Sequence, residues 1–414
     1  MGRARRTREK GGNVSDGWRA DREITPNRRV PRRPREPVFR AWHVVCLAAG
    51  LFALGVRVLL DGHPEKVEFG YSRLFYPYLA DILAWPARLV PAPMSAAELA
   101  VGVLLIAVPV WICYRIAVTV RRGASIPRRL VHFGGSGLAL AALLYTIYLS
   151  AWGINYLRMP FFPSLESEIS PAQLKLADYA GMAEALVQSA NILRPGVMSS
   201  PEEADPERLD RRVNRAVRRV VRDVYGDGFP EPPPTKTLAV NRLLNATGIS
   251  GFFFPFFMEP HVNADLSAWE RPCTMAHEKA HFMGFASETD ASLIAYIACL
   301  TDESPRLRYS GALRVLPSIL ARLPARDRDR IRAGLDPAVV ADLRQRAARL
   351  DRYRRQSGRL MEARKRVNDA YLKLNAQKEG IRTYGAAIPR LVAWWWDRRG
   401  GPMESRRGPR SPRI

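Results

Sequence analysis

Two histidines four residues apart, with a glutamate directly after the first, are the residues whose spacing best predicts chemistry here. They are His277, Glu278 and His281, and the chain of 414 residues holds only six histidines. Residues at i and i+4 share one face of a helix, so both imidazoles would point into the same cleft. Two imidazoles placed in this way can bind one Zn²⁺, and Glu278 beside them can reach a water molecule.

This spacing, HExxH, is typical of zinc metallopeptidases, in which the metal acidifies a water molecule and the glutamate takes its proton. Chance alone would produce the motif in roughly one such chain in two hundred, so the motif alone is only suggestive. A catalytic zinc also needs a third protein ligand and one open position. Gly284 follows three residues after His281 and can end the helix in a left-handed turn.

The third ligand is expected at the start of a second helix, just beyond that turn. The sequence SETDA, residues 287–291, opens an apolar stretch with helical character. A carboxylate at this point can complete the site if the two helices pack together, and Glu288 is the first choice, with Asp290 as the alternative. Acidic residues are favoured at helix N-termini in any case, so a purely structural role stays open for both.

An aromatic segment, residues 248–263, precedes the motif and is interrupted by two prolines. We interpret it as an extended segment or irregular hairpin next to the site. His261 is expected to line the cleft as a loop residue rather than to bind metal. Glu259 and Asn263 could contact the substrate backbone or orient the ligand histidines.

Three apolar runs within the first 160 residues predict membrane-spanning helices at about 41–60, 97–120 and 130–156. The first run is too far from the N-terminus and too long for a cleavable signal peptide. Arginines are concentrated before the first run and between the second and third, whereas the 61–96 loop has few basic residues. This asymmetry predicts an N-terminus in the cytoplasm, and it places everything after the third span outside the cytoplasmic (inner) membrane.

The formal net charge of +24 predicts an anionic partner. Residues 1–38 form a basic tail without apolar periodicity, which we expect to be disordered and to bind anionic lipid headgroups. No aromatic platform or recognised module accompanies its arginines, so the sequence does not favour nucleic acid as the partner. The four cysteines contain no CxxC pair, and whether Cys273 and Cys299 form a disulfide is left open.

The rest of the chain is predicted to be mainly α-helical, with a soluble domain over residues 157–396 and a disordered tail over 397–414. Ser170, followed by proline and then by Gln173, is typical of a helix N-terminus. The predicted helices are 170–193, 206–225, 305–322, 336–355, 360–374 and 384–396, besides the two helices that carry the motif.

Four blocks of the sequence together resemble an uncharacterised bacterial family of zincin-like integral membrane proteins that carries an unknown-function label. The blocks are AWGINYLRMP, GISGFFFPFFMEPHVN, AHEKAHFMGFASETDAS and VNDAYLKLNAQKEGIRTYG. The resemblance covers about residues 40–396 and implies a few N-terminal spans followed by an HExxH domain. The site is also similar to that of gluzincins, whose third ligand is a glutamate opening an ExxA(D/N) helix. That glutamate falls on Glu288, and Ser292 stands where an acid or Asn is usual. The third histidine of metzincins would fall on Ser287, so that assignment fails.

Together these features predict a membrane-anchored zinc metallopeptidase-like hydrolase that acts on peptide or protein substrates outside the cytoplasmic membrane. Zinc peptidases usually also direct a His, Tyr or Arg at the developing oxyanion. Arg382 and Tyr384 are predicted for this role, with Tyr371 as a further candidate, although the tyrosines could equally be core aromatics. The alternative is a non-catalytic membrane protein, structural or regulatory, with a degenerate zinc site.

Overall fold

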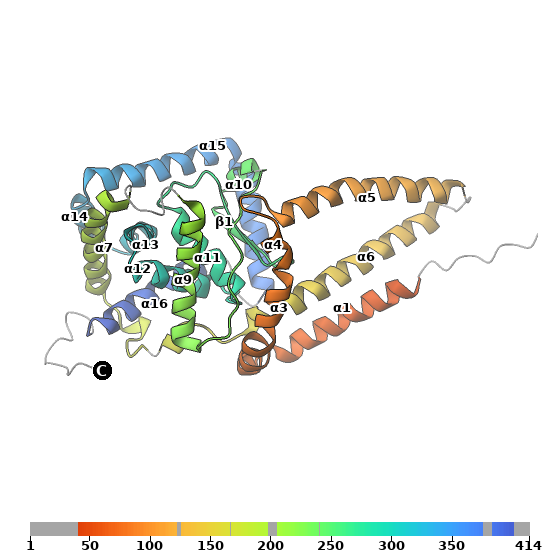
Figure 1. The fold of residues 1–414 in the computed structure, drawn as a ribbon, viewed down its shortest axis with the longest axis horizontal. Helices are drawn as coiled ribbons and strands as arrows, with labels where there is room; N and C mark the ends of the chain where they lie inside the picture. Colours follow the sequence, from red (N-terminus) through yellow and green to blue (C-terminus); the bar gives the residue numbers. More distant parts are fainter. Residues whose placement is uncertain are drawn as a thin grey trace, which may run out of the picture.

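Three long helices project from one side of a helical domain (Figure 1). They are α1 (Ala41–Leu60), α5 (Ala96–Arg121) and α6 (Ile126–Ala151). The computed structural model describes residues 40–121, 126–165, 167–197, 205–239, 241–375 and 383–400, so the predicted tail 1–38 and most of 397–414 lie outside it. All three helices are long and apolar enough to cross a membrane. This confirms the predicted fold class, a three-helix membrane region followed by a mainly helical domain.

The third of these helices ends at Ala151, five residues before the predicted end at Tyr156. It stops because Trp152 leaves the helical conformation, with φ −152° and ψ −36°, and a 3₁₀ turn, η2 (Gly153–Leu157), follows. Helices α1 and α6 pack closely, since a Cβ atom at Gly50 would lie only 2.8 Å from the Cβ of Ala142. Small residues allow this approach in lipid.

The segment between α1 and α5, treated in the sequence only as a loop, is largely helical. It contains α2 (Pro64–Lys66), a π-helix η1 (Val67–Phe75), α3 (Tyr76–Leu83) and α4 (Trp85–Leu89). Helices α3 and α4 lie between the three long helices and the domain (Figure 1). The buried hydroxyl of Tyr76 donates to the carbonyl of Phe282 at 2.7 Å, at the end of α11 (Arg271–Phe282).

The domain surrounds α12 (Glu288–Leu300), whose side chains are almost all buried. Helices α9, α11, α13 and α16 all contact α12. Besides α11 and α12, the domain contains η3 (Phe162–Leu165), η4 (Pro171–Gln173), α7 (Leu176–Val197), α9 (Pro206–Tyr225), α10 (Asn241–Thr247), α13 (Pro305–Leu320), α14 (Ala325–Ala333), α15 (Pro337–Leu374) and α16 (Thr383–Arg398).

Two helix predictions need correction. Ser170 does form a capping box, but with the short 3₁₀ turn η4, and α7 begins only at Leu176. The helices predicted at 336–355 and 360–374 are one element, α15, which bends at Ser357, where φ is −143° and ψ is 31°. The residues between the two predicted helices therefore form a kink within α15 and not a loop.

The aromatic segment before the motif forms a small antiparallel hairpin, as expected. Strand β1 (Gly251–Phe254) pairs with β2 (Glu259–Val262), with Gly251 opposite Val262. Both strands contact α11. The hairpin thus forms one wall beside the helix that carries the histidine pair.

Candidate metal centre

Helix α11 presents His277 and His281 on one face and ends soon after them. Gly284 has φ +82°, a conformation that suits glycine, and it turns the chain back. Ser287 then caps α12, because its hydroxyl accepts a hydrogen bond from the backbone N–H of Asp290. This turn lets α12 begin at Glu288, packed against α11.

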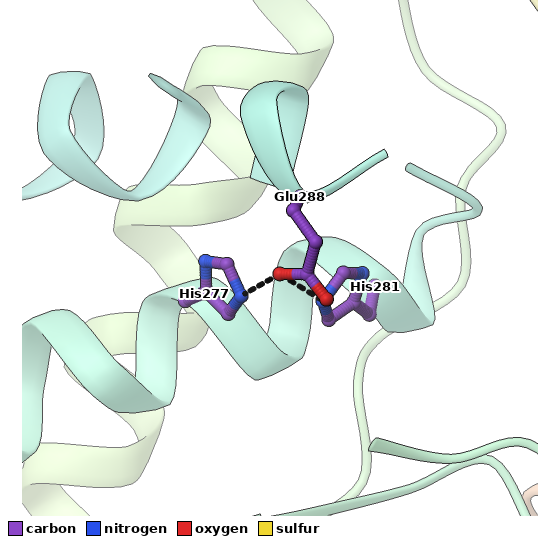
Figure 2. Close-up of side chains that lie close together, drawn as sticks. All are labelled: His277, His281 and Glu288. Atoms are coloured by element: carbon purple, nitrogen blue, oxygen red, sulfur yellow. Dashed lines mark hydrogen bonds and ion pairs between the residues drawn. The ribbon is translucent and has the colours of Figure 1, made fainter. Parts of the chain in front are cut away.

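Glu288, the first choice for the third ligand, lies beside both histidines (Figure 2). Its Oε2 atom lies 3.1 Å from Nε2 of His277 and 3.7 Å from Nε2 of His281. One potential ligand atom from each residue falls within 4.8 Å of the others. Asp290, the alternative, is buried but does not belong to this group.

The outer nitrogens of both imidazoles also have partners. Nδ1 of His281 donates to the carbonyl of Phe285 at 2.8 Å, and Nδ1 of His277 lies 3.3 Å from the hydroxyl of Ser292. These contacts fix the rings and leave each Nε2 facing Glu288. Ser292, which stands where an acid or Asn is usual, therefore contacts a candidate ligand in the manner of a supporting residue.

The charges in this group are strongly coupled. Burial by itself raises the pKa of Glu288, but hydrogen bonds and charge from the two histidines outweigh it and hold that pKa well below its usual range. Burial lowers the pKa of His281, yet the hydrogen bond and charge of Glu288 raise it to about 9 overall. The pKa of His277 is lowered, mainly by burial. The two imidazoles thus favour the carboxylate form of Glu288, and Glu288 in turn favours the protonated form of His281.

Glu278 lies in a more apolar environment than Glu288. Its side chain is buried, and burial raises its pKa to about 8, with the nearby Glu288 charge adding to the shift. The hairpin approaches it closely, since a Cβ atom at Gly251 would lie 2.6 Å from Oε1 of Glu278. The absence of a side chain at Gly251 therefore makes room for the carboxylate.

A cavity of about 450 Å³ adjoins the group, and His277, Glu278, His281 and Glu288 all line it. Its other walls come from distant parts of the chain. They include Trp152, Tyr156, Phe253, Arg314, Arg364 and Tyr371. Among these, Tyr371 was a candidate from sequence, whereas no motif marks Arg314, which α13 supplies.

The structure gives different outcomes for the residues that were predicted to stabilise a developing oxyanion. Tyr371 lies at the cavity, with its hydroxyl 2.7 Å from that of Tyr148 and accepting a hydrogen bond from Tyr156 at 3.3 Å. Arg382 falls outside the described residues. Tyr384 lies in the first turn of α16, and its side chain is outside the described part. The roles of Arg382 and Tyr384 stay predictions.

The expectations for three residues near the hairpin were wrong. His261 is fully buried in β2, with Nε2 2.9 Å from the hydroxyl of Ser95, and does not line the cavity. The Glu259 carboxylate accepts hydrogen bonds from the first two backbone N–H groups of α5, both at 3.0 Å. Asn263 donates to the carbonyl of Ile249. Because alternate side chains of β2 face away from α11, these groups hold the hairpin and α5 in place.

The family comparison covers most of the chain, including the candidate centre. A family model described as "Protein of unknown function (DUF3810)" matches residues 71–392, from η1 to α16. Comparison with curated proteins and with solved structures gives no match. The extent of the family match shows that this chain belongs to the DUF3810 family, whose function is unknown.

Proposed function

We propose that the protein is a membrane-anchored zinc metallopeptidase-like hydrolase that acts on peptide or protein substrates at the outer side of the cytoplasmic membrane. The observation that carries this proposal is the convergence of His277, His281 and Glu288 beside the buried carboxylate of Glu278. All four side chains line one cavity.

The donor set suits zinc. Two imidazole nitrogens and one carboxylate oxygen are typical of a catalytic zinc site, whereas Ca²⁺ and Mg²⁺ prefer oxygen ligands throughout. His277, His281 and Glu288 would hold the ion, with Phe285 and Ser292 fixing the outer nitrogens of the two rings. Bound Zn²⁺ would act as a Lewis acid and lower the pKa of a water molecule.

Glu278 is placed to act as the general base. It neighbours a ligand histidine along the helix but is turned about 100 degrees from it, so it can serve a water molecule in the cavity instead of the metal. Arg314 and the Tyr156–Tyr371 pair line the same cavity and could donate to a developing oxyanion.

Metal content is the first test. The purified full-length protein should contain about one zinc per chain, and the double substitution His277→Ala with His281→Ala should remove it. A surface variant such as Asp329→Asn, on α14, should keep the metal and controls for handling. Full zinc retention in the double variant would place the ligands elsewhere.

Hydrolysis of a broad peptide library separates the enzyme from the alternative, a structural or regulatory protein with a degenerate site. Wild-type protein loaded with zinc should cleave library members, and the double variant should not. If the wild type binds zinc and cleaves nothing, and Glu278→Gln has no effect in cells, the structural interpretation replaces the proposed one.

A further inference from the structure

The candidate centre begins directly where a membrane-crossing helix ends. Helix α6 stops at Ala151, and the next residue, Trp152, donates from its indole N–H to the carbonyl of His281 at 3.2 Å. The two ring centroids are 6.0 Å apart. Trp152 also lines the cavity. The residue that directly follows a predicted spanning helix is therefore part of the wall of the site.

A second part of the cavity wall is tied to the ends of α6 and α1. Tyr371 of α15 lies at the cavity, and its hydroxyl is 2.7 Å from that of Tyr148 in the last turn of α6. Arg57, in the last turn of α1, donates to the carbonyl of Leu374, the last residue of α15. Residues Trp152 and Tyr371 of the cavity wall are thus tied to the end of α6, and the end of α15, which carries Tyr371, is tied to the end of α1.

A stripe of exposed apolar side chains runs beside these helix ends, along η1, α3 and α4. Its members recur at helical spacing, so they form one face. They are Phe75, Tyr78, Ile82, Trp85 and Leu89, each more than half exposed. The opposite face is buried and contains Tyr76, Ala80, Ala84 and Ala87.

Lipid at the membrane surface is the occupant that this stripe fits. The segment joins two candidate spans and lies between the three long helices and the domain (Figure 1), and the spans that it joins also expose large apolar side chains, such as Leu59 of α1 and Leu99 of α5. Aromatic residues such as Tyr78 and Trp85 are enriched at the membrane–water interface, where helices with one apolar face also lie. This arrangement holds the candidate centre at the surface of the membrane.

Resting on the proposed function, we infer that the centre acts on polypeptides whose susceptible segment lies within a few residues of their own membrane anchor. A free peptide in solution must find the cavity by diffusion in three dimensions. A segment held at the same surface as the cavity is presented at a high effective concentration. Because the Trp152 ring, directly after α6, lies 6.0 Å from the His281 ring, a short spacer between anchor and susceptible segment is enough to reach the centre.

The test uses a peptide hydroxamate, which binds zinc sites, and full-length protein in phospholipid vesicles. Three forms of the hydroxamate are compared. The first has no anchor, the second is joined to two palmitoyl chains through a linker of two residues, and the third is joined to the same chains through a linker of twenty residues. Two residues reach about 7 Å. The short-linker form should bind with a Kd lower by on the order of 100-fold than the unanchored form. If only the long-linker form gains affinity, the cavity is remote from the membrane and the inference fails, while the zinc site stands.

A second measurement locates the cavity without using the metal. Single cysteines carrying a fluorescent label replace Ile82 on the stripe, Lys365 at the cavity, or Ile192 on α7. All three positions are exposed, and α7 lies on the far side of the domain from the three spans (Figure 1). Cys46 and Cys113 are replaced by alanine, and the buried Cys273 and Cys299 remain.

Lipids with a nitroxide at headgroup depth should quench the labels at positions 82 and 365 and spare the label at 192. Equal quenching at all three positions, or none at 82 and 365, would overturn the membrane-surface placement. If positions 82 and 365 are quenched but no hydroxamate form binds, the placement holds and the proposed zinc function fails. The two proposals can therefore fail separately.

Discussion

At the residue scale, two glutamates ten residues apart have different environments and different expected roles. Oε2 of Glu288 lies 3.1 and 3.7 Å from the two candidate ligand nitrogens, so its carboxylate belongs to the candidate ligand group. Glu278 makes no hydrogen bond to any residue that the structure describes and lines the cavity beside them. The split between base and ligand proposed here depends on this difference.

Substitution of each glutamate by glutamine should separate the two roles. Glu278→Gln should keep its zinc and lose hydrolysis by about 100-fold or more, because a general base contributes on that order. Glu288→Gln should lose or weaken zinc binding as well as activity, since it removes a charged ligand. Zinc content and peptide hydrolysis are the measurements. Asp290→Asn is the matched control, and loss of zinc there with retention in Glu288→Gln would move the third ligand by two residues.

Gly251 is the residue at which the hairpin meets Glu278. A Cβ atom there would lie 2.6 Å from Oε1 of Glu278 and 2.8 Å from the backbone oxygen of His261. Gly251→Ala should therefore displace the carboxylate or the strand and cost about 1–3 kcal/mol of stability, with reduced hydrolysis. Thermal unfolding and activity check this. Gly102→Ala on α5, where nothing lies within 4 Å, should be neutral, and equal effects of the two changes would contradict the packing argument.

At the element scale, the hairpin joins the candidate centre to α5, one of the three candidate membrane spans. The β2 carboxylate of Glu259 caps the N-terminus of α5, and its neighbour Ser95 contacts both Glu259 and His261. On the other side of the motif helix, buried Lys279 pairs with Asp210 of α9 at 3.0 Å. Helix α11 is therefore packed against the hairpin on one side and held by a buried ion pair on the other.

Stability should depend on pH through Glu259. Burial raises its pKa, but hydrogen bonds from His261, Ala97, Ser95 and Ala96 outweigh this and lower it from 4.5 to about 2. Because the pKa is lower in the folded state, the stabilisation is complete above pH 4.5 and is lost as the pH falls towards 2.

Glu259→Gln should cost about 2 kcal/mol near neutral pH, since it weakens hydrogen bonds to a charged group. It should also remove this part of the acid sensitivity. Unfolding of the detergent-solubilised protein, followed between pH 6 and pH 3, measures both effects. Glu207→Gln on α9, where the side chain is largely exposed, is the control. An unchanged pH profile in Glu259→Gln would show that the cap contributes no such stabilisation.

At the scale of the whole molecule, the orientation of the protein in the membrane is predicted from the distribution of its arginines, and it stays a prediction. The arginines at 28–40 and in the 121–129 loop predict a cytoplasmic side, and three crossings would put the domain outside. The basic surface of α9 does not reverse this, because long domains cross largely regardless of charge. All parts of the candidate centre described above then lie on one side of the membrane.

Reporter fusions test this orientation. A reporter active only in the cytoplasm should give signal when fused after residue 123 and none when fused near residue 200, and a reporter active only outside should give the reverse. Equal signals from the two positions would refute the three-span arrangement with an external domain.

The sequence by itself determined the spans, the helical domain and the choice of His277, His281 and Glu288 as candidate ligands. Each rests on local information: continuous apolar length, i to i+4 spacing, and a glycine turn followed by a helix start. Even the hairpin before the motif follows from its local pattern. These features need no knowledge of distant contacts.

Only the tertiary structure decided what surrounds the centre. Trp152, Arg314 and Tyr371 come from three elements far apart in sequence, and nothing in their local patterns shows that they share a cavity. Likewise, the burial of His261 against Ser95 depends on where β2 meets α5. The exposed apolar stripe in the 61–96 segment is also not evident from the sequence. It forms because the alanines of this segment pack inward on the domain while larger side chains face outward. Side-chain surroundings depend on which distant surfaces pack together, and local sequence does not specify that packing.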